Sequence, residues 1–191
     1  MKVSKAQAAE NRASIIDVAS KQMRRGGFGA MTVAEVAKAA GLTHGALYSH
    51  FPSKEALSSE ALAEGFRQCH SDFSKLALDD LLSQYLSLEH RDFPESGCPM
   101  AALVSQISQQ DSAIQEEFAD GFDGFVSLVK NGLKAEGRSS TESRELSMFA
   151  VAAMVGALAI SRALQEAKPA ASETMLGVVR RQLARLFAPA A

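Results

Sequence analysis

The sequence predicts an all-α protein of about nine helices. Apolar residues recur at helical spacing along most of the 191-residue chain, and glycine or proline separates the helical segments. No segment shows the alternating apolar and polar pattern of a half-buried strand. Because 47% of the residues are apolar, the chain has enough of them to bury a core.

Three helices are predicted in the first 52 residues. The first runs from Ala6 to Arg25 and stops at "GGFGA", since glycine adopts the conformations that end a helix. Thr32 and Glu35 form a capping box that starts the second, which continues to Gly41. The third spans residues 44–50 and is ended by a proline. These boundaries define a first domain, residues 1–52.

The second predicted domain covers residues 53–191 and contains the remaining helices. Ser53 caps a long helix with one apolar stripe, from Leu62 to Phe73. Residues 76–89 predict a shorter helix and "HRDFPESGCP" a loop, followed by helices over 99–109 and 112–136. Thr141 starts a further helix that ends before Pro169, and a last one opens at residues 172 and 173.

The composition argues against membrane, metal and enzyme classes. The longest nearly uncharged apolar run, residues 148–160, is shorter than the roughly 20 residues that a bilayer span needs. The N-terminus has no signal-peptide pattern, so we expect a cytoplasmic protein. No histidine or cysteine spacing is typical of a metal site, and no Walker sequence, dinucleotide loop or nucleophile elbow is present. We therefore expect no enzymatic activity, no cofactor and no metal.

The charge is distributed unevenly along the chain. Residues 1–54 contain eight Lys or Arg against three Asp or Glu, a net charge of +5, whereas the whole chain carries -2. The rest of the chain therefore carries -7. Such an asymmetry indicates that the first domain meets a polyanion.

The segment 32–54 has the pattern of a helix-turn-helix. Ala37, Gly41 and Leu47 are what two helices need to cross closely through a short turn, while the outer face of the second helix stays polar. A DNA major groove admits one helix, whose first turns reach base edges. His44 is therefore predicted to read a base, and Gly45 to allow close approach. Predicted phosphate partners are Thr32, Thr43, Tyr48 and Lys54.

Residues 12–58, above all "GLTHGALYSHFPSKEAL", resemble the N-terminal DNA-binding domain of the TetR/AcrR transcriptional regulators. The resemblance implies an Ω-shaped homodimer with three DNA-binding helices and a ligand-binding and dimerisation domain in each subunit. Two features depart from the family pattern: the glycine-rich "RRGGFGA" and the small Ser49, where many relatives carry an aromatic residue. The implied contacts to double-stranded operator DNA fall on Thr32, Thr43, His44, Gly45, Tyr48, His50 and Lys54.

Apolar residues of the second domain are candidates for the lining of an effector cavity between helices. Ligand sites in helical domains lie between helices and are mostly apolar, so we expect a small apolar effector between the 62–73 and 118–125 stripes. The same residues would equally serve as ordinary core. The predicted lining residues are Phe66, Phe73, Met100, Leu103, Phe118, Phe122, Phe125 and Met148.

The last two helices are predicted to form the homodimer interface. Small residues there permit close helix approach, and an apolar stripe on the final helix would be exposed in an isolated subunit. The predicted interface residues are Ala152, Ala153, Gly156, Ala157, Leu176, Val179, Leu183 and Leu186.

Together these patterns predict a ligand-responsive DNA-binding regulator, a repressor released from a palindromic operator by a small apolar molecule. Two alternatives remain open. One is an all-helical adaptor that uses the helix-turn-helix to bind protein. The other is a thiol-responsive repressor that uses Cys98, which precedes a proline suited to the first position of a helix, where a thiolate is stabilised.

Overall fold

The computed structural model describes residues 4–188 and is all-α, as predicted: these residues form ten α-helices and two short 3-10 helices, with no strand. In chain order the elements are α1 (Lys5–Ala30), α2 (Val33–Ala39), α3 (His44–Tyr48), α4 (Lys54–Phe73), α5 (Leu78–Tyr85), α6 (Leu88–Asp92), η1 (Pro94–Ser96), α7 (Pro99–Leu103), η2 (Ile107–Gln109), α8 (Ser112–Ala135), α9 (Ser140–Leu164) and α10 (Pro169–Phe187).

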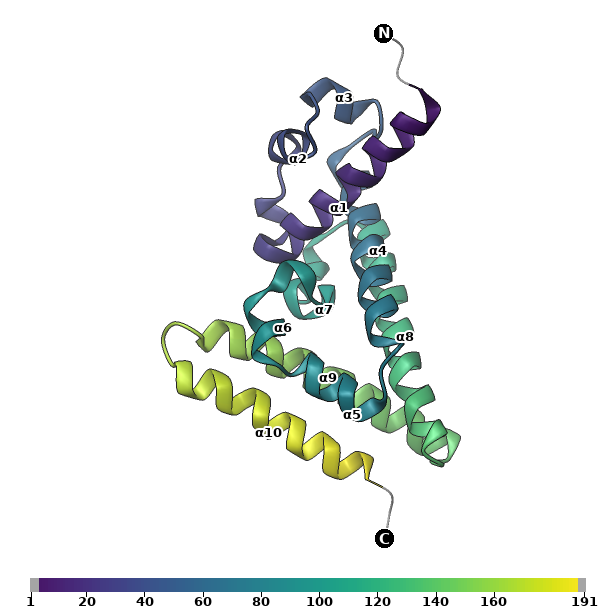
Figure 1. Ribbon diagram of the computed structural model, residues 1–191, viewed down its shortest axis with the longest axis vertical. Helices are drawn as coiled ribbons and strands as arrows, with labels where there is room; N and C mark the ends of the chain where they lie inside the picture. Colours follow the sequence, from purple (N-terminus) through teal and green to yellow (C-terminus); the bar gives the residue numbers. More distant parts are fainter. Residues whose placement is uncertain (1–3, 189–191) are drawn as a thin grey trace.

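The helices form a head and a body (Figure 1). The head consists of α1, α2 and α3 at one end of the molecule, and α4 leads from it into the body. There α4 packs along α8, α8 packs on α9, and α9 packs on α10. Because α4 also packs against α1, this one helix belongs to the core of both parts.

Side-chain caps and one glycine fix the geometry of the head. The Thr32 hydroxyl accepts a hydrogen bond from the N–H of Glu35 and donates one of 2.8 Å to its carboxylate. Caps of this kind stabilise a helix by about 1 kcal/mol. Gly41 then adopts a φ of 70°, the left-handed region that glycine tolerates best, and turns the chain toward α3. Leu47 of α3 is buried in the joint, as predicted.

Several helix boundaries differ from the sequence prediction. The "GGFGA" segment kinks α1 at Gly27, which has a φ of 80°, but helical turns continue to Ala30. The predicted helix 76–89 is two helices, α5 and α6, because the chain leaves helical geometry at Leu86. Most of the predicted loop "HRDFPESGCP" is helical, since it contains the end of α6 and all of η1.

The later boundaries shift by a few residues. Pro99 is the first residue of α7, as predicted, but this helix ends at Leu103 and not at residue 109. Ser139, not Thr141, caps α9, and it forms a capping box with Glu142. The final helix begins at Pro169, which places Ser172 inside it.

Helix α9 is the one helix among residues 4–188 that is long and apolar enough to cross a membrane by length and composition. It packs between α8 and α10. Since core helices of globular domains pass the same test, this helix is weak evidence for a membrane span.

Candidate DNA-binding surface and effector cavity

The predicted reading residues share one exposed surface. Thr43, His44, Gly45 and Tyr48 are all exposed, on α3 and its cap. The His44 ring meets the Tyr48 ring edge-on, with 5.2 Å between centroids, so the two side chains support each other. Thr32 is also exposed, at the N-terminus of α2. The arrangement offers two helix N-termini and a paired aromatic surface to a groove.

The two glycines of this segment have different roles. Gly41 is required by its positive φ, although a side chain there would meet no neighbour. Gly45 lies within α3 and has no such conformational need, and a methyl group at this position would also meet nothing within 4 Å. The absence of a side chain at Gly45 therefore leaves open space on the exposed surface of α3.

The remaining two predicted DNA contacts lie at the edge of the surface. Lys54 is half-buried, and its Nζ donates a 3.1 Å hydrogen bond to the carbonyl of Phe28. This lysine therefore links the start of α4 to the end of α1. Two protons of its ammonium group remain available to donate to a phosphate. His50 is half-buried beside the buried Phe51. Lys38, in the last turn of α2, is exposed, and the sequence analysis had not included it.

The two aromatic stripes pack against each other. The Phe66 ring meets the Phe118 ring edge-on, with 5.9 Å between centroids. The Phe66 ring also lies so close to Gly121 that a methyl group on Gly121 would clash with it. Phe73 meets Phe125 in the same way at 5.8 Å. Met100 and Leu103 are buried beside them, whereas Phe122 is half-buried. Met148 lies away from this cluster, 46% exposed near the start of α9.

A cavity of about 340 Å³ lies next to this cluster, between the end of α4 and the α5–η1 segment. Of the predicted lining residues only Phe73 borders it. The lining combines aromatic and polar groups: Asp72, Phe73, Gln84, Ser87, Glu89, His90, Phe93, Ser96 and Gly97. Four of the nine lining residues lie in the stretch 90–99, which the sequence predicts as a loop, and three lie in the predicted helix 76–89, so the periodicity gave no signal for a cavity here.

His90 holds the wall of this cavity in place. Its Nδ1 donates a 2.8 Å hydrogen bond to the backbone carbonyl of Tyr85, and its Nε2 accepts a 2.9 Å hydrogen bond from the backbone N–H of Cys98. Burial, helped by the charges of Arg162 and Arg24, lowers the pKa of His90 to about 4, although the bond to Tyr85 opposes the shift. The imidazole is therefore neutral at pH 7.

Cys98 is fully buried at the start of α7. Burial raises its pKa, but the neighbouring Cys69 thiol, the Tyr85 side chain and the N–H groups of Met100 and Ala101 lower it, and the net result is a pKa of about 7. The thiol is closed off from solvent within the subunit.

The predicted dimer residues divide into two sets. Ala157, Leu176 and Leu183 are buried within the subunit, where they join α9 to α10. Ala152 and Leu186 are exposed, and the others are half-buried: Ala153, Gly156 and Val179. The sequence analysis missed three large exposed apolar side chains on the same two helices, Phe149, Ile160 and Val178.

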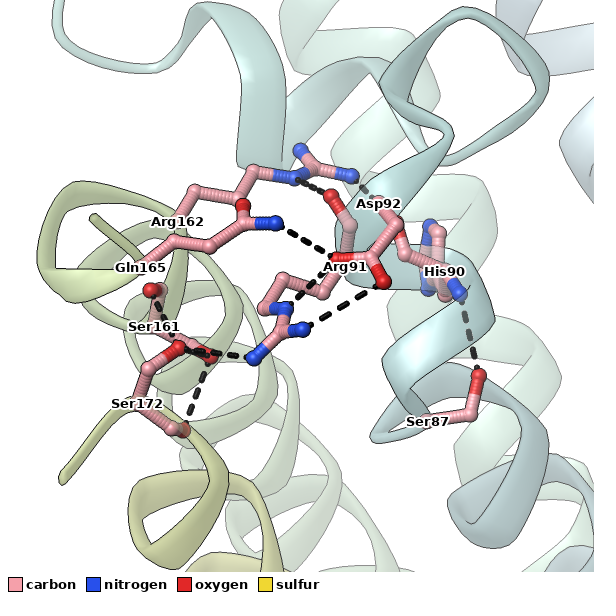
Figure 2. A network of polar contacts seen from close by, with 8 residues as sticks. All are labelled: Ser87, His90, Arg91, Asp92, Ser161, Arg162, Gln165 and Ser172. Carbon is pink, nitrogen blue, oxygen red and sulfur yellow. Dashed lines mark hydrogen bonds and ion pairs between the residues drawn. The ribbon is translucent and has the colours of Figure 1, made fainter. Parts of the chain in front are cut away.

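A polar network joins the cavity wall to the last two helices, and Figure 2 shows it. Arg91 donates to the Ser172 hydroxyl and to both oxygens of Asp92. Arg162 donates to the carbonyl oxygens of Arg91 and His90. The hydroxyl groups of Ser161 and Ser172 form a 2.8 Å hydrogen bond with each other. Arg91, Ser161 and Ser172 are buried, and helical periodicity alone does not identify the hydrogen-bond partners of buried polar side chains.

A second set of polar contacts joins the body to the head. Arg24 of α1 donates to the carbonyl of Gly97 at 3.0 Å and to the side chain of Gln68 at 2.9 Å. The side-chain amide oxygen of Gln106 accepts a 3.1 Å hydrogen bond from the backbone N–H of Phe28, next to the kink in α1. Movement of the α6–α7 segment therefore reaches α1 directly.

Family models match both parts of the chain. The model for bacterial regulatory proteins of the tetR family matches residues 15–61, and the C-terminal domain model of LmrA/YxaF-like transcriptional regulators matches residues 77–172. The chain belongs to the TetR family of transcriptional regulators. Among residues 4–188 no group of His, Cys, Asp or Glu side chains is placed to hold a metal ion.

Individual relatives agree with this assignment. The chain is 32% identical to the transcriptional repressor KstR2 of Rhodococcus jostii over 72% of its length, and the match spans 61% of KstR2. It is 23% identical to the regulator LmrA of Bacillus subtilis, covering 84% of this chain and 90% of LmrA. The fold matches the reduced form of E. coli NemR with a TM-score of 0.76 at 20% identity, covering 95% of this chain and 99% of that one.

Proposed function

We propose that this TetR-family protein is a transcriptional repressor that binds a palindromic operator as a homodimer and is released by a small molecule. The exposed surface formed by Thr43, His44, Gly45 and Tyr48 carries the proposal. A helix that presents such residues at its first turns fits a major groove, with His44 toward base edges and its neighbours toward phosphates. The family membership and the +5 charge of residues 1–54 support it.

The apolar outer face of α9 and α10 supports the dimer. Phe149, Ile160, Val178 and Leu186 expose between 40% and 57% of their surface in the single subunit. Large apolar side chains gathered on one face mark a protein interface. A second copy of the chain that packs this face on itself gives a two-fold dimer with two reading heads, as a palindrome requires.

The effector is proposed to bind in the 340 Å³ cavity beside Phe73, and not between the two packed stripes. Phe73 and Phe93 supply apolar surface for a small, largely apolar molecule, while Ser87 and Gln84 offer hydrogen bonds. The cavity lies at the far end of α4, which spans about 30 Å and starts directly after the reading helix. An occupant that shifts α4 would change the spacing of the two heads.

The function is tested by selecting DNA from a random pool with the purified full-length protein and then titrating the selected site. We expect a palindromic sequence. Tyr48→Ala should weaken binding to all sequences, His44→Ala should mainly relax base preference, and Lys38→Gln should lower the salt slope by about 1.

The matched control is Lys134→Gln, which removes an exposed positive charge from the distant end of α8 and should leave the salt slope unchanged. Recovery of no preferred sequence, together with salt-independent binding of a protein partner, would favour the adaptor. For the effector, Phe93→Glu should abolish release of operator DNA by any inducing compound while leaving operator affinity intact.

A further inference from the structure

Two guanidinium groups, one buried and one half-buried, make no ion pair with a carboxylate among residues 4–188. Arg24 is 3% exposed and donates only to neutral acceptors, namely two carbonyl oxygens and the Gln68 amide oxygen. Arg162 donates to two carbonyl oxygens, and its Nη1 is buried without a hydrogen-bond partner among residues 4–188. Burial lowers the pKa of both side chains, which reflects the cost of holding these charges away from water.

Both arginines border the same groove. The groove has a volume of about 440 Å³ and lies where the end of α1 meets α6, α7 and α9. It is lined by four arginines and one aspartate, with small apolar residues between them: Arg24, Arg25, Arg91, Asp92, Pro94, Ala101, Ala102, Ser105, Ala159, Arg162 and Gln165. The lining therefore carries a net charge of +3.

The carboxylate in the lining of the groove already has hydrogen-bond partners. Asp92 accepts hydrogen bonds from Arg91 and from Gln165, as Figure 2 shows. Asp17 and Glu64 accept hydrogen bonds from the Gln68 side chain and attract the Arg24 charge from a distance, without a direct ion pair. Arg25 is exposed and makes no hydrogen bond or ion pair within the described part of the chain. Buried charges in proteins are normally paired, so the groove has an excess of unpaired cations.

We propose that this groove binds a compact organic oxyanion with two or more negative charges. Guanidinium groups match carboxylate and phosphate oxygens in a two-point geometry, and the groove offers several of them around one volume. The small side chains of Ala101, Ala102 and Ala159 leave room for the carbon skeleton of such a ligand. This site is separate from the cavity beside Phe73, since the two share no lining residue.

The location gives the site a second property. Arg24 and Arg25 belong to α1 of the head, whereas Arg91 and Arg162 belong to the body. An anion that contacts both pairs would join the head to the body. Binding to the site does not depend on the proposed operator or effector, so it is testable with the protein alone.

The test is calorimetric titration of the full-length protein with citrate and, separately, with pyrophosphate, at an ionic strength held constant with sodium chloride. We expect saturable binding of one anion per subunit for at least one of the two probes. Comparing them distinguishes carboxylate from phosphate recognition. Arg25→Gln should weaken that binding about tenfold, which corresponds to about 1.4 kcal/mol, because it removes one charge-assisted contact.

Two further measurements locate the site. Lys134→Gln, the matched loss of one exposed charge, should bind the anion as the wild type does. The bound anion should also slow modification of Arg25 by phenylglyoxal, followed by mass spectrometry, but not modification of the exposed Arg67. Arg162→Lys keeps the positive charge but loses the planar guanidinium group that can donate two parallel hydrogen bonds, so it should weaken binding as well. Absence of saturable binding with both probes, or equal affinity in Arg25→Gln and Lys134→Gln, would overturn the proposal.

Discussion

Arg24 of α1 donates a 3.0 Å hydrogen bond to the carbonyl of Gly97, 73 residues further along the chain. Gly97 precedes Cys98 and lies against the His90 ring, where a methyl group on Gly97 would clash. One guanidinium thus connects the head to the wall of the 340 Å³ cavity, the proposed effector site. This contact gives an occupant of the cavity a second route to the head, besides the long helix α4.

Replacing Arg24 by Leu should destabilise the protein by about 1 to 3 kcal/mol, because the Gly97 carbonyl and the Gln68 amide lose a buried partner. The measurement is urea denaturation of both proteins. Arg67→Gln is the control: it removes an exposed arginine that pairs with Glu64 and should barely change stability. An Arg24→Leu variant as stable as the wild type would show that these two bonds contribute nothing net.

Gly41→Ala should mainly lower stability, whereas Gly45→Ala should mainly lower operator affinity. The first places a side chain at a φ of 70° and should cost about 1 to 2 kcal/mol of stability. The second adds a methyl group within a helix where nothing is in contact, so stability should be unchanged or slightly higher, while operator affinity falls. Thermal unfolding and DNA titration measure the two effects. Full operator affinity in Gly45→Ala would contradict a close approach of α3 to DNA.

Acid should weaken the fold through His90. An unfolded histidine titrates near 6.5, whereas His90 titrates at about 4 in the folded protein, so the unfolded state takes up the proton first as pH falls. The stabilisation is complete above pH 6.5 and is lost between pH 6.5 and 4, about 3 kcal/mol in total.

His90→Gln lacks this titration, so its difference in unfolding free energy from the wild type should shrink steadily between pH 7 and pH 4. Denaturation curves at several pH values measure it. His44→Gln, at an exposed position on α3, should keep the full acid dependence. A difference between the His90 variant and the wild type that stays constant with pH would refute the role of His90.

The dimer face should be sensitive to charge. Phe149→Glu and Ile160→Glu place a carboxylate on exposed apolar positions of α9, so each should convert a dimer into folded monomers with weakened operator binding. Sedimentation velocity measures the assembly. Leu88→Glu, an equally exposed apolar position on α6, should leave it intact. Dimers that persist in both α9 variants would place the interface elsewhere.

Cys98 should react slowly in the folded protein despite its lowered pKa. Both thiols are buried, so an alkylating reagent reaches them only when the structure opens. We expect alkylation of Cys98 at pH 7 to be far slower than that of a free thiol and to accelerate on addition of urea, with Cys69→Ser as the control for the second thiol. Rapid alkylation of folded Cys98 would return the thiol-responsive repressor to consideration.

The head was predictable from the sequence because its structure is specified locally. The cap at Thr32, the left-handed turn at Gly41 and the buried anchor Leu47 act within 16 residues, and each residue type has one main structural reason to be there. The helical class and the long helices followed from periodicity in the same way. The kink at Gly27 did not, because the Gln106 side chain that contacts it lies far along the chain. The break at Leu86 did not either, because residues 76–89 keep a helical pattern across it.

The sequence by itself determined the all-helical class, the helix-turn-helix and the family resemblance, since these depend on periodicity, caps and turns between near neighbours. Only the tertiary structure decided where cavities remain. Phe66 of α4 approaches Gly121 of α8 so closely that a methyl group on Gly121 would clash, a contact that no local pattern encodes. The packing of α9 on α10 buried Leu176 and Leu183 and left Phe149 outside. The arginine groove likewise depends on residues 24, 91 and 162 meeting in space, which no local pattern encodes.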